Sequence, residues 1–139
     1  MKKVLVIDGQ GGGIGKALIT QLRSLMPEQE IIALGTNALA TAGMLRAGAN
    51  NGATGENAIC FNCRDADIIL GAVGILAADA MLGELTPAMA RAIADSSAIK
   101  LLVPMNRCHI RVVGAQNRPI EVLIAEPALQ AAEVIGWGL

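Results

Sequence analysis

Apolar runs and segments of helical periodicity alternate along most of this chain. Residues 3–7 and 30–34 are short apolar runs, typical of central strands in a parallel sheet. Between them, apolar residues recur every three or four positions until Pro27, as on one face of a helix. These positions are Ile14, Leu18, Leu22 and Leu25. The pattern therefore predicts a strand, a helix and a second strand at the start of the chain.

The same alternation predicts the remaining elements. We expect further strands at 58–62, 66–71, 100–103 and 109–113, the last of them as an antiparallel edge strand. We expect further helices at 38–47, at 73–82, from Thr86-Pro87 onward, and within 119–135, where Pro127 interrupts or begins the helix. Residues 49–57 are rich in turn-forming types and are expected to form a loop.

This order of elements predicts an α/β fold. We expect a three-layer, Rossmann-like architecture with a mostly parallel sheet and helices on both of its faces. Neither an internal repeat nor a linker divides the sequence, so residues 1–139 are expected to form a single domain. This length leaves no room for a second, substrate-binding domain.

Composition and charge narrow the possible functions. Hydrophobic residues make up 53% of the chain and charged residues 17%, which indicates a globular protein. The 11 basic and 12 acidic residues are spread along the chain, which argues against nucleic acid as a partner. Tyrosine is absent, and Phe61 and Trp137 are the only aromatic residues, so the chain has no platform for stacking bases.

The sequence predicts a cytoplasmic protein with no membrane association. The longest uncharged apolar run, 68–78, is too short to cross a bilayer. Lys2 and Lys3 precede an apolar run that ends at Asp8, well short of a secretory signal. The three cysteines are then expected to be free thiols in a reducing compartment.

A glycine-rich stretch, IDGQGGGIGK, joins the first predicted strand to the first predicted helix. In a parallel α/β fold this turn lies at the carboxyl edge of the sheet, where ligands bind. Unpaired N–H groups at a helix start attract a phosphate, and glycine lets the phosphate approach the backbone. The alternative is a tight turn that needs glycine only for packing. The expected binding residues here are Gly9, Gln10, Gly11, Gly12, Gly13, Ile14, Gly15 and Lys16.

The glycine spacing distinguishes between known phosphate-binding loops. A Walker loop is excluded, because Ala17 follows Lys16, and G-x-G-x-x-G is excluded by Ile14. The spacing G-x-x-x-G-x-G fits Gly9, Gly13 and Gly15, and it resembles the cofactor loop of the short-chain dehydrogenase/reductases. That resemblance covers the first strand–helix–strand unit and implies NAD(P) or a similar nucleotide. The same family uses a catalytic tyrosine, which this chain lacks.

Two further segments are expected to meet the ligand. Nucleotide-binding folds of this kind usually place an acidic residue after the second strand, but here the sequence is Gly35-Thr36-Asn37. We expect Thr36 and Asn37 to bind hydroxyl groups or a phosphate. Asn106 and Arg107 follow a later strand and are expected to close the far side, since guanidinium groups bind phosphate in a bidentate manner. The alternative for this pair is a surface turn.

Nearly the whole chain resembles a small bacterial family known as domain-of-unknown-function family 3842. The resemblance rests on IDGQGGGIGK (7–16), ALGTNALAT (33–41), AGANNGATGENAI (47–59), MLGELTP (81–87) and PMNRC (104–108). It implies a Rossmann-like fold. The family carries no established activity or catalytic residues to transfer.

Two carboxylates and a cysteine–histidine set are also candidates. Asp8 either caps the turn after the first strand or holds a Mg²⁺ next to a phosphate. Glu56 is a candidate general base in a second polar loop. Cys60, Cys63, Cys108 and His109 suggest a zinc site, because a CxxC pair suits zinc. Cys108 and His109, however, are adjacent on a predicted strand and would point to opposite faces, so they would not easily bind the same ion. Buried free thiols are therefore the preferred interpretation, and no metal is expected.

The sequence thus predicts binding of a nucleotide, an NAD(P)-like dinucleotide or another phosphorylated small molecule at the glycine loop. It leaves open whether a reaction follows. Trp137 near the C-terminus indicates a homodimer or higher homo-oligomer. Two alternatives remain: a structural or regulatory oligomeric subunit without a small ligand, and a metal-binding module.

Overall fold

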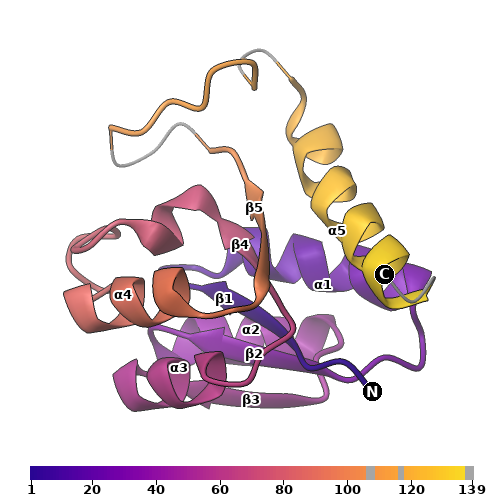
Figure 1. Cartoon of the computed structure of the whole chain (residues 1–139), viewed down its shortest axis with the longest axis horizontal. Helices are drawn as coiled ribbons and strands as arrows, with labels where there is room; N and C mark the ends of the chain where they lie inside the picture. The colour runs from indigo at the N-terminus through magenta and orange to yellow at the C-terminus, as the bar shows by residue number, and fades with distance from the viewer. Residues whose placement is uncertain (106–108, 116–117, 137–139) are drawn as a thin grey trace.

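Parallel strands alternate with helices in the computed structural model, which describes residues 1–105, 109–115 and 118–136 (Figure 1). The strands are β1 (Val4–Asp8), β2 (Ile31–Gly35), β3 (Asn51–Thr54), β4 (Ile68–Ala72) and β5 (Ile99–Val103). The helices are α1 (Gly13–Leu25), α2 (Ala38–Ala47), α3 (Glu56–Cys63), the 3₁₀-helix η1 (Val73–Leu76), α4 (Pro87–Asp95) and α5 (Ile120–Gly136).

The strands form one sheet in the order β3-β2-β1-β4-β5, and every pair in it is parallel. The predicted α/β fold is therefore confirmed, and the sheet is fully parallel. The chain builds outward from β1 to β3 and then crosses to β4 on the other side of β1. The order of strands thus reverses between β1 and β4, which is the position where open α/β sheets bind ligands.

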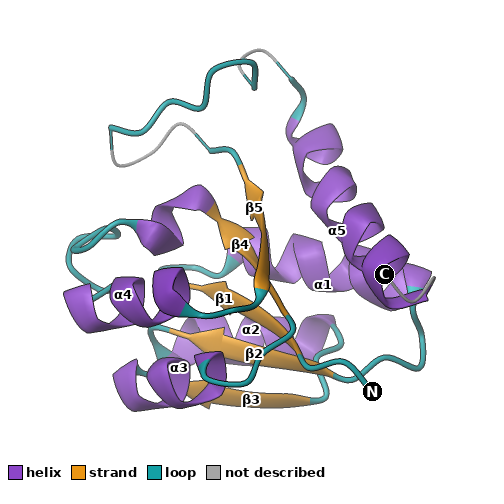
Figure 2. Ribbon diagram, viewed as in Figure 1, coloured by secondary structure: helices purple, strands orange, loops and turns teal. Residues whose placement is uncertain are grey.

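Helices cover both faces of the sheet, because successive side chains of a strand point to opposite faces (Figure 2). Val4 and Val6 of β1 belong to a core cluster that includes residues of α1, α2 and α5. Leu5 and Ile7 belong to a second cluster, with residues of α3, η1 and α4. All four side chains are buried, which explains why β1 is apolar throughout.

Four predicted segments differ from the structure. Residues 58–62, predicted as a strand, lie within α3. Of the predicted helix 73–82, only η1 forms, and the chain continues in turns to residue 85. Residues 109–113, predicted as an edge strand, contain no strand. Part of the predicted loop 49–57 is β3, which pairs with β2.

Other predictions are confirmed. Helix α4 begins as predicted, with Thr86 as its cap and Pro87 in its first turn. Its predicted apolar face (Met89, Ala90 and Ile93) is buried. The predicted closing helix is α5, but it runs through Pro127 without a break, so the prediction that this proline interrupts or begins the helix was wrong.

Candidate functional site

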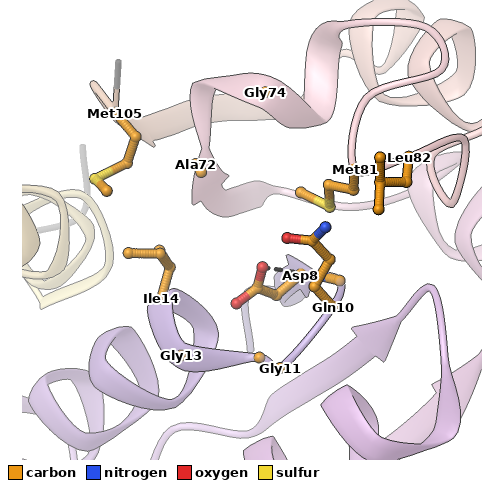
Figure 3. A pocket seen from close by; sticks show the side chains of 12 residues that line it. Asp8, Gln10, Gly11, Gly13, Ile14, Ala72, Gly74, Met81, Leu82 and Met105 are labelled. Carbon is orange, nitrogen blue, oxygen red and sulfur yellow. Dashed lines mark hydrogen bonds between the residues drawn. The ribbon is translucent and has the colours of Figure 1, made fainter. Parts of the chain in front are cut away.

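A cavity of about 490 Å³ lies at the carboxyl edge of the sheet, at the point where the strand order reverses. Figure 3 shows the glycine loop after β1 on one side of it, with the end of β4 and the turns after η1 on the other. The lining residues are Asp8, Gly9, Gln10, Gly11, Gly12, Gly13, Ile14, Ala72, Gly74, Met81, Leu82 and Met105. The volume falls in the range of roughly 300–1,000 Å³ that is usual for small-molecule sites.

Three glycines of the loop are required by the fold itself. A methyl group on Gly9 would lie 2.5 Å from the hydroxyl oxygen of Thr36, and one on Gly15 would lie 2.5 Å from the sulfur of Met44. Gly12 has a φ angle of +73°, in the left-handed region that favours glycine. The spacing that suggested a cofactor loop is thus set in part by packing.

Gly11 and Gly13 are different, because packing does not require glycine at either position. A methyl group on either residue would meet no heavy atom within 4 Å, and neither φ angle is positive. Among the described residues, the N–H groups of Gly11, Gly13 and Ile14 have no hydrogen-bond acceptor. All three residues line the cavity. At the start of α1 the cavity is thus lined by residues that have open space beside the backbone and unpaired N–H donors, an arrangement suited to an anionic group.

Asp8 connects the end of β1 to the start of α1. Its side chain is buried, with 5% exposure, and its two carboxylate oxygens accept hydrogen bonds from Gly9 N–H at 2.8 Å and Gly15 N–H at 2.6 Å. Asp8 therefore caps the turn and the first turn of α1. Its charge opposes part of the positive end of the helix dipole.

Glu84 brings a second carboxylate to the same loop from the turns after η1. Its Oε1 atom accepts hydrogen bonds from the N–H of Gln10 at 2.9 Å, the hydroxyl of Thr36 at 2.7 Å and the side-chain amide of Asn37 at 2.9 Å. These bonds, led by that of Thr36, hold the pKa of Glu84 below its ordinary value. The lowered pKa favours the ionised carboxylate of Glu84, which lies beside the glycine loop and binds the N–H of Gln10.

The structure separates the predicted ligand-binding residues into groups. Gly9 to Ile14 line the cavity, whereas Gly15 is covered by Asp8 and Met44. Lys16 is exposed, and its side-chain carbons lie beside Gly43 of α2.

Thr36 and Asn37 bind Glu84, and Asn37 also caps α2 by accepting the N–H of Ala40 at 2.8 Å. Gly74, from the segment after β4, lines the cavity. Asn106 and Arg107 lie outside the described residues.

Glu84 and Met81 were missed by sequence reasoning. Glu84 contacts Gln10 across 74 positions of sequence, and no local pattern marks such a contact. Residues 73–82 were predicted as a helix, which would have carried Met81 along a regular face. Met105 lies two residues after β5, at the sheet edge where the segment 105–107 was expected.

The cysteines do not assemble with histidine in the described residues. Cys63 is buried in α3, and burial raises the pKa of its thiol from 9.0 to about 11, which disfavours the thiolate that zinc requires. Cys60 lies one helical turn earlier, and His109 is exposed in a turn. No group of three or more metal-binding side chains is found in the described residues, and Cys108 lies outside them.

Glu56 lies away from the cavity, at the first turn of α3. Its Oε1 atom accepts a hydrogen bond of 2.6 Å from the hydroxyl of Thr86, the cap of α4. The contact joins the starts of two helices, and Glu56 is not among the cavity-lining residues.

Strand order, glycine loop and cavity together define a Rossmann-like α/β protein with a pocket at the reversal point of its sheet. The protein-family model described as "Domain of unknown function (DUF3842)" matches residues 3–135. The chain belongs to that family, which confirms the resemblance found in its sequence. Among curated proteins, none matches the chain significantly.

One solved structure is similar in fold. It is the crystal structure of a dodecameric FMN-dependent UbiX-like decarboxylase from Escherichia coli O157:H7, with 14% sequence identity and a TM-score of 0.41. The alignment covers 98% of this chain and 95% of that chain. In the described part of the present chain, no helix has the length and apolar character needed to span a membrane.

Proposed function

We propose that this protein binds a nucleotide or another phosphorylated small molecule, with a phosphate group at the start of α1. The observation that carries the proposal is the combination of open space and unpaired donors at Gly13. Gly13, Gly11 and Ile14 line a cavity of about 490 Å³, and their N–H groups have no acceptor within the described residues. Oriented backbone N–H groups at a helix start are a common way to hold a phosphate.

The rest of the cavity supports an organic group attached to that phosphate. Ile14, Ala72, Met81 and Met105 contribute apolar surface to its lining. Small-molecule sites are mostly apolar, with a few well-placed polar groups that fix the orientation of the ligand. The proposed ligand therefore places its phosphate on the glycine loop and its organic part against the ends of β4 and β5.

Native mass spectrometry of gently purified protein tests this proposal. The expected spectrum shows extra mass from a phosphorylated metabolite, which Gly13→Val removes by filling the space in front of the N–H groups. Gly136→Val is the matched control, because Gly136 also lies at a helix end with no heavy atom within 4 Å of an added methyl group.

The proposal fails if the wild-type protein is bare and titration with inorganic phosphate leaves the amide signals of Gly11, Gly13 and Ile14 unchanged. A bare oligomer would instead favour a structural or regulatory subunit.

We further propose that the chain acts as one domain and as a homo-oligomer in the cytoplasm. Helices α1 to α5 pack around a single sheet, which supports one domain. Leu82 and Val113 are 97% and 91% exposed, and contact with another subunit would remove both apolar side chains from water. The free thiols of Cys60 and Cys63 fit a reducing compartment. Light scattering of the purified protein measures the subunit number.

A further inference from the structure

The crevice above the sheet has two parts that differ in how much space they leave. The β2 end is the part above Gly9, next to Thr36 and Asn37. The β4 side is the part between Gly13 and the end of β4. The cavity extends from Gly9 to the end of β4 but is not lined by Thr36 or Asn37. On the β4 side, an added methyl group on Gly13 meets no heavy atom within 4 Å. At the β2 end, a methyl group on Gly9 would lie 2.6 Å from the sulfur of Met81.

Donors at the β2 end are already used. The N–H of Gln10, the hydroxyl of Thr36 and the side-chain amide of Asn37 all donate to the same atom, Oε1 of Glu84. Asn37 also donates to the carbonyl oxygen of Gln10 at 2.9 Å. A ligand hydroxyl or phosphate placed here would have to displace the carboxylate and then satisfy three donors in its place.

A dinucleotide bound in the usual way needs both parts of the crevice. Its pyrophosphate lies at the start of the first helix, and an acidic residue at the end of the second strand binds the ribose hydroxyls. In this chain β2 ends at Gly35, and Thr36 and Asn37 follow it without an acid. The acid comes from residue 84 instead, and it occupies the space next to these residues.

We propose that Glu84 is a specificity-determining residue that closes the β2 end and restricts the site to short phosphorylated ligands. Such a ligand has one phosphate group on the N–H groups of α1 and one organic part on the β4 side. A dinucleotide is excluded, because its ribose would meet Glu84 and Met81. The inference rests on the proposed phosphate site and names the class of ligand that this site accepts.

The negative charge of Glu84 also disfavours a ligand at the β2 end, in addition to the space that its side chain occupies. The carboxylate adjoins the N–H of Gln10, within the glycine loop, so a second phosphate group placed toward the β2 end would meet a like charge. Replacing Glu84 by alanine removes both the charge and the side chain that fills the space. Replacing it by glutamine removes the charge and keeps the size.

Binding of three probes to isotope-labelled protein tests the inference. Inorganic phosphate, AMP and NAD⁺ are titrated separately, and the amide signals of Gly13 and Gln10 report on the two parts of the crevice. Wild-type protein is expected to bind phosphate and AMP, and to bind NAD⁺ at least about tenfold more weakly than AMP. Glu84→Ala is expected to raise NAD⁺ affinity about tenfold and to leave phosphate affinity unchanged.

Two controls separate structural from specific effects. Glu56→Ala removes a carboxylate that also accepts a threonine hydroxyl, but lies away from the cavity, and it is expected to change none of the three affinities. Glu84→Gln keeps the size of the side chain and is expected to give a smaller gain in NAD⁺ affinity than Glu84→Ala. It replaces Glu84→Ala in the experiment if that variant does not fold.

The inference is overturned, with the phosphate site intact, if wild-type protein binds NAD⁺ as tightly as AMP. It is also overturned if both Glu84 variants keep the wild-type ratio of NAD⁺ to AMP affinity. If neither phosphate nor AMP moves the Gly13 signal, the proposed function itself fails and the inference fails with it.

Discussion

Alanine substitutions at Gly15 and Gly13 are expected to change stability in opposite directions. Both residues lie in the first turn of α1, and neither has a positive φ angle. A methyl group on Gly15, however, would lie 2.5 Å from the sulfur of Met44 and 3.1 Å from Oδ2 of Asp8. That Oδ2 atom accepts the N–H of Gly15, so the substitution disturbs both the packing and the cap of the helix.

The magnitudes follow from known costs. Overpacking of a tight site costs about 1–3 kcal/mol. Alanine is a better helix former than glycine by up to about 1 kcal/mol, and less at a helix end. Gly15→Ala is therefore expected to destabilise the protein by about 1–2 kcal/mol, and Gly13→Ala to stabilise it by roughly 0.5 kcal/mol. For a chain of this length, 1 kcal/mol corresponds to a change in melting temperature of about 3–4 °C.

Thermal unfolding followed by circular dichroism measures the difference. The protein must first be freed of bound ligand, because a ligand held by wild-type protein alone would raise its apparent stability. A Gly13→Ala variant that melts as low as Gly15→Ala would refute the reasoning, since the space in front of Gly13 could not then be open. A Gly15→Ala variant as stable as wild type would show that Met44 moves aside at little cost.

Two further predictions concern titrating groups. Because hydrogen bonds hold the pKa of Glu84 below 4.5, its carboxylate stabilises the fold above that pH, and the contribution is lost as the pH falls further. Glu84→Gln should thus melt below wild type near neutral pH, with a gap in melting temperature that narrows as the pH falls below 4.5, and a constant gap would contradict this. Burial raises the pKa of Cys63 to about 11, so iodoacetamide should alkylate Cys63 at least about tenfold more slowly than Cys60 in the native protein. Peptide mass mapping measures both rates, and equal rates would contradict the burial of Cys63.

The central strands could be predicted from sequence because their apolar character follows from their burial. Strands β1 and β4 are covered on both faces, and every one of their residues is buried. Strand β3 was missed because it is not buried and so lacks this apolar character. It lies at the edge of the sheet, three of its four residues are exposed, and its sequence NGAT resembles a turn. Its existence depends on pairing with β2 and not on its own pattern.

Helix α3 was mistaken for a strand because a short apolar run suits either structure. The run AICF fits a strand, but the helix places Ile59 and Cys63 on one face, four residues apart, where both are buried. Phe61 then points outward and is 57% exposed. Only the position of the sheet decides between the two possibilities.

The candidate site was predictable in its location and not in its boundaries. A glycine-rich turn after a buried first strand places a site at the sheet edge for general reasons. Packing in three dimensions separates Gly9 and Gly15, which the fold requires, from Gly13, which it does not. The contacts of Glu84 with the glycine loop also could not be predicted from sequence, because they depend on the turns between η1 and α4 that bring it next to Gln10.

The turns between η1 and α4 have a further consequence, for the dynamics of the site. Asp79, Met81 and Leu82 have φ angles of 65°, 59° and 56°, and each such conformation costs a non-glycine residue about 1–2 kcal/mol. Burial of Leu85 and the three hydrogen bonds to Glu84 oppose that cost. The turns between η1 and α4 therefore carry more backbone strain than the sheet beside them, and we expect them to open locally before the whole chain unfolds. The rate at which this segment opens would then set how often the β2 end of the crevice becomes accessible, and amide hydrogen exchange would detect it as a region of low protection next to a well-protected sheet.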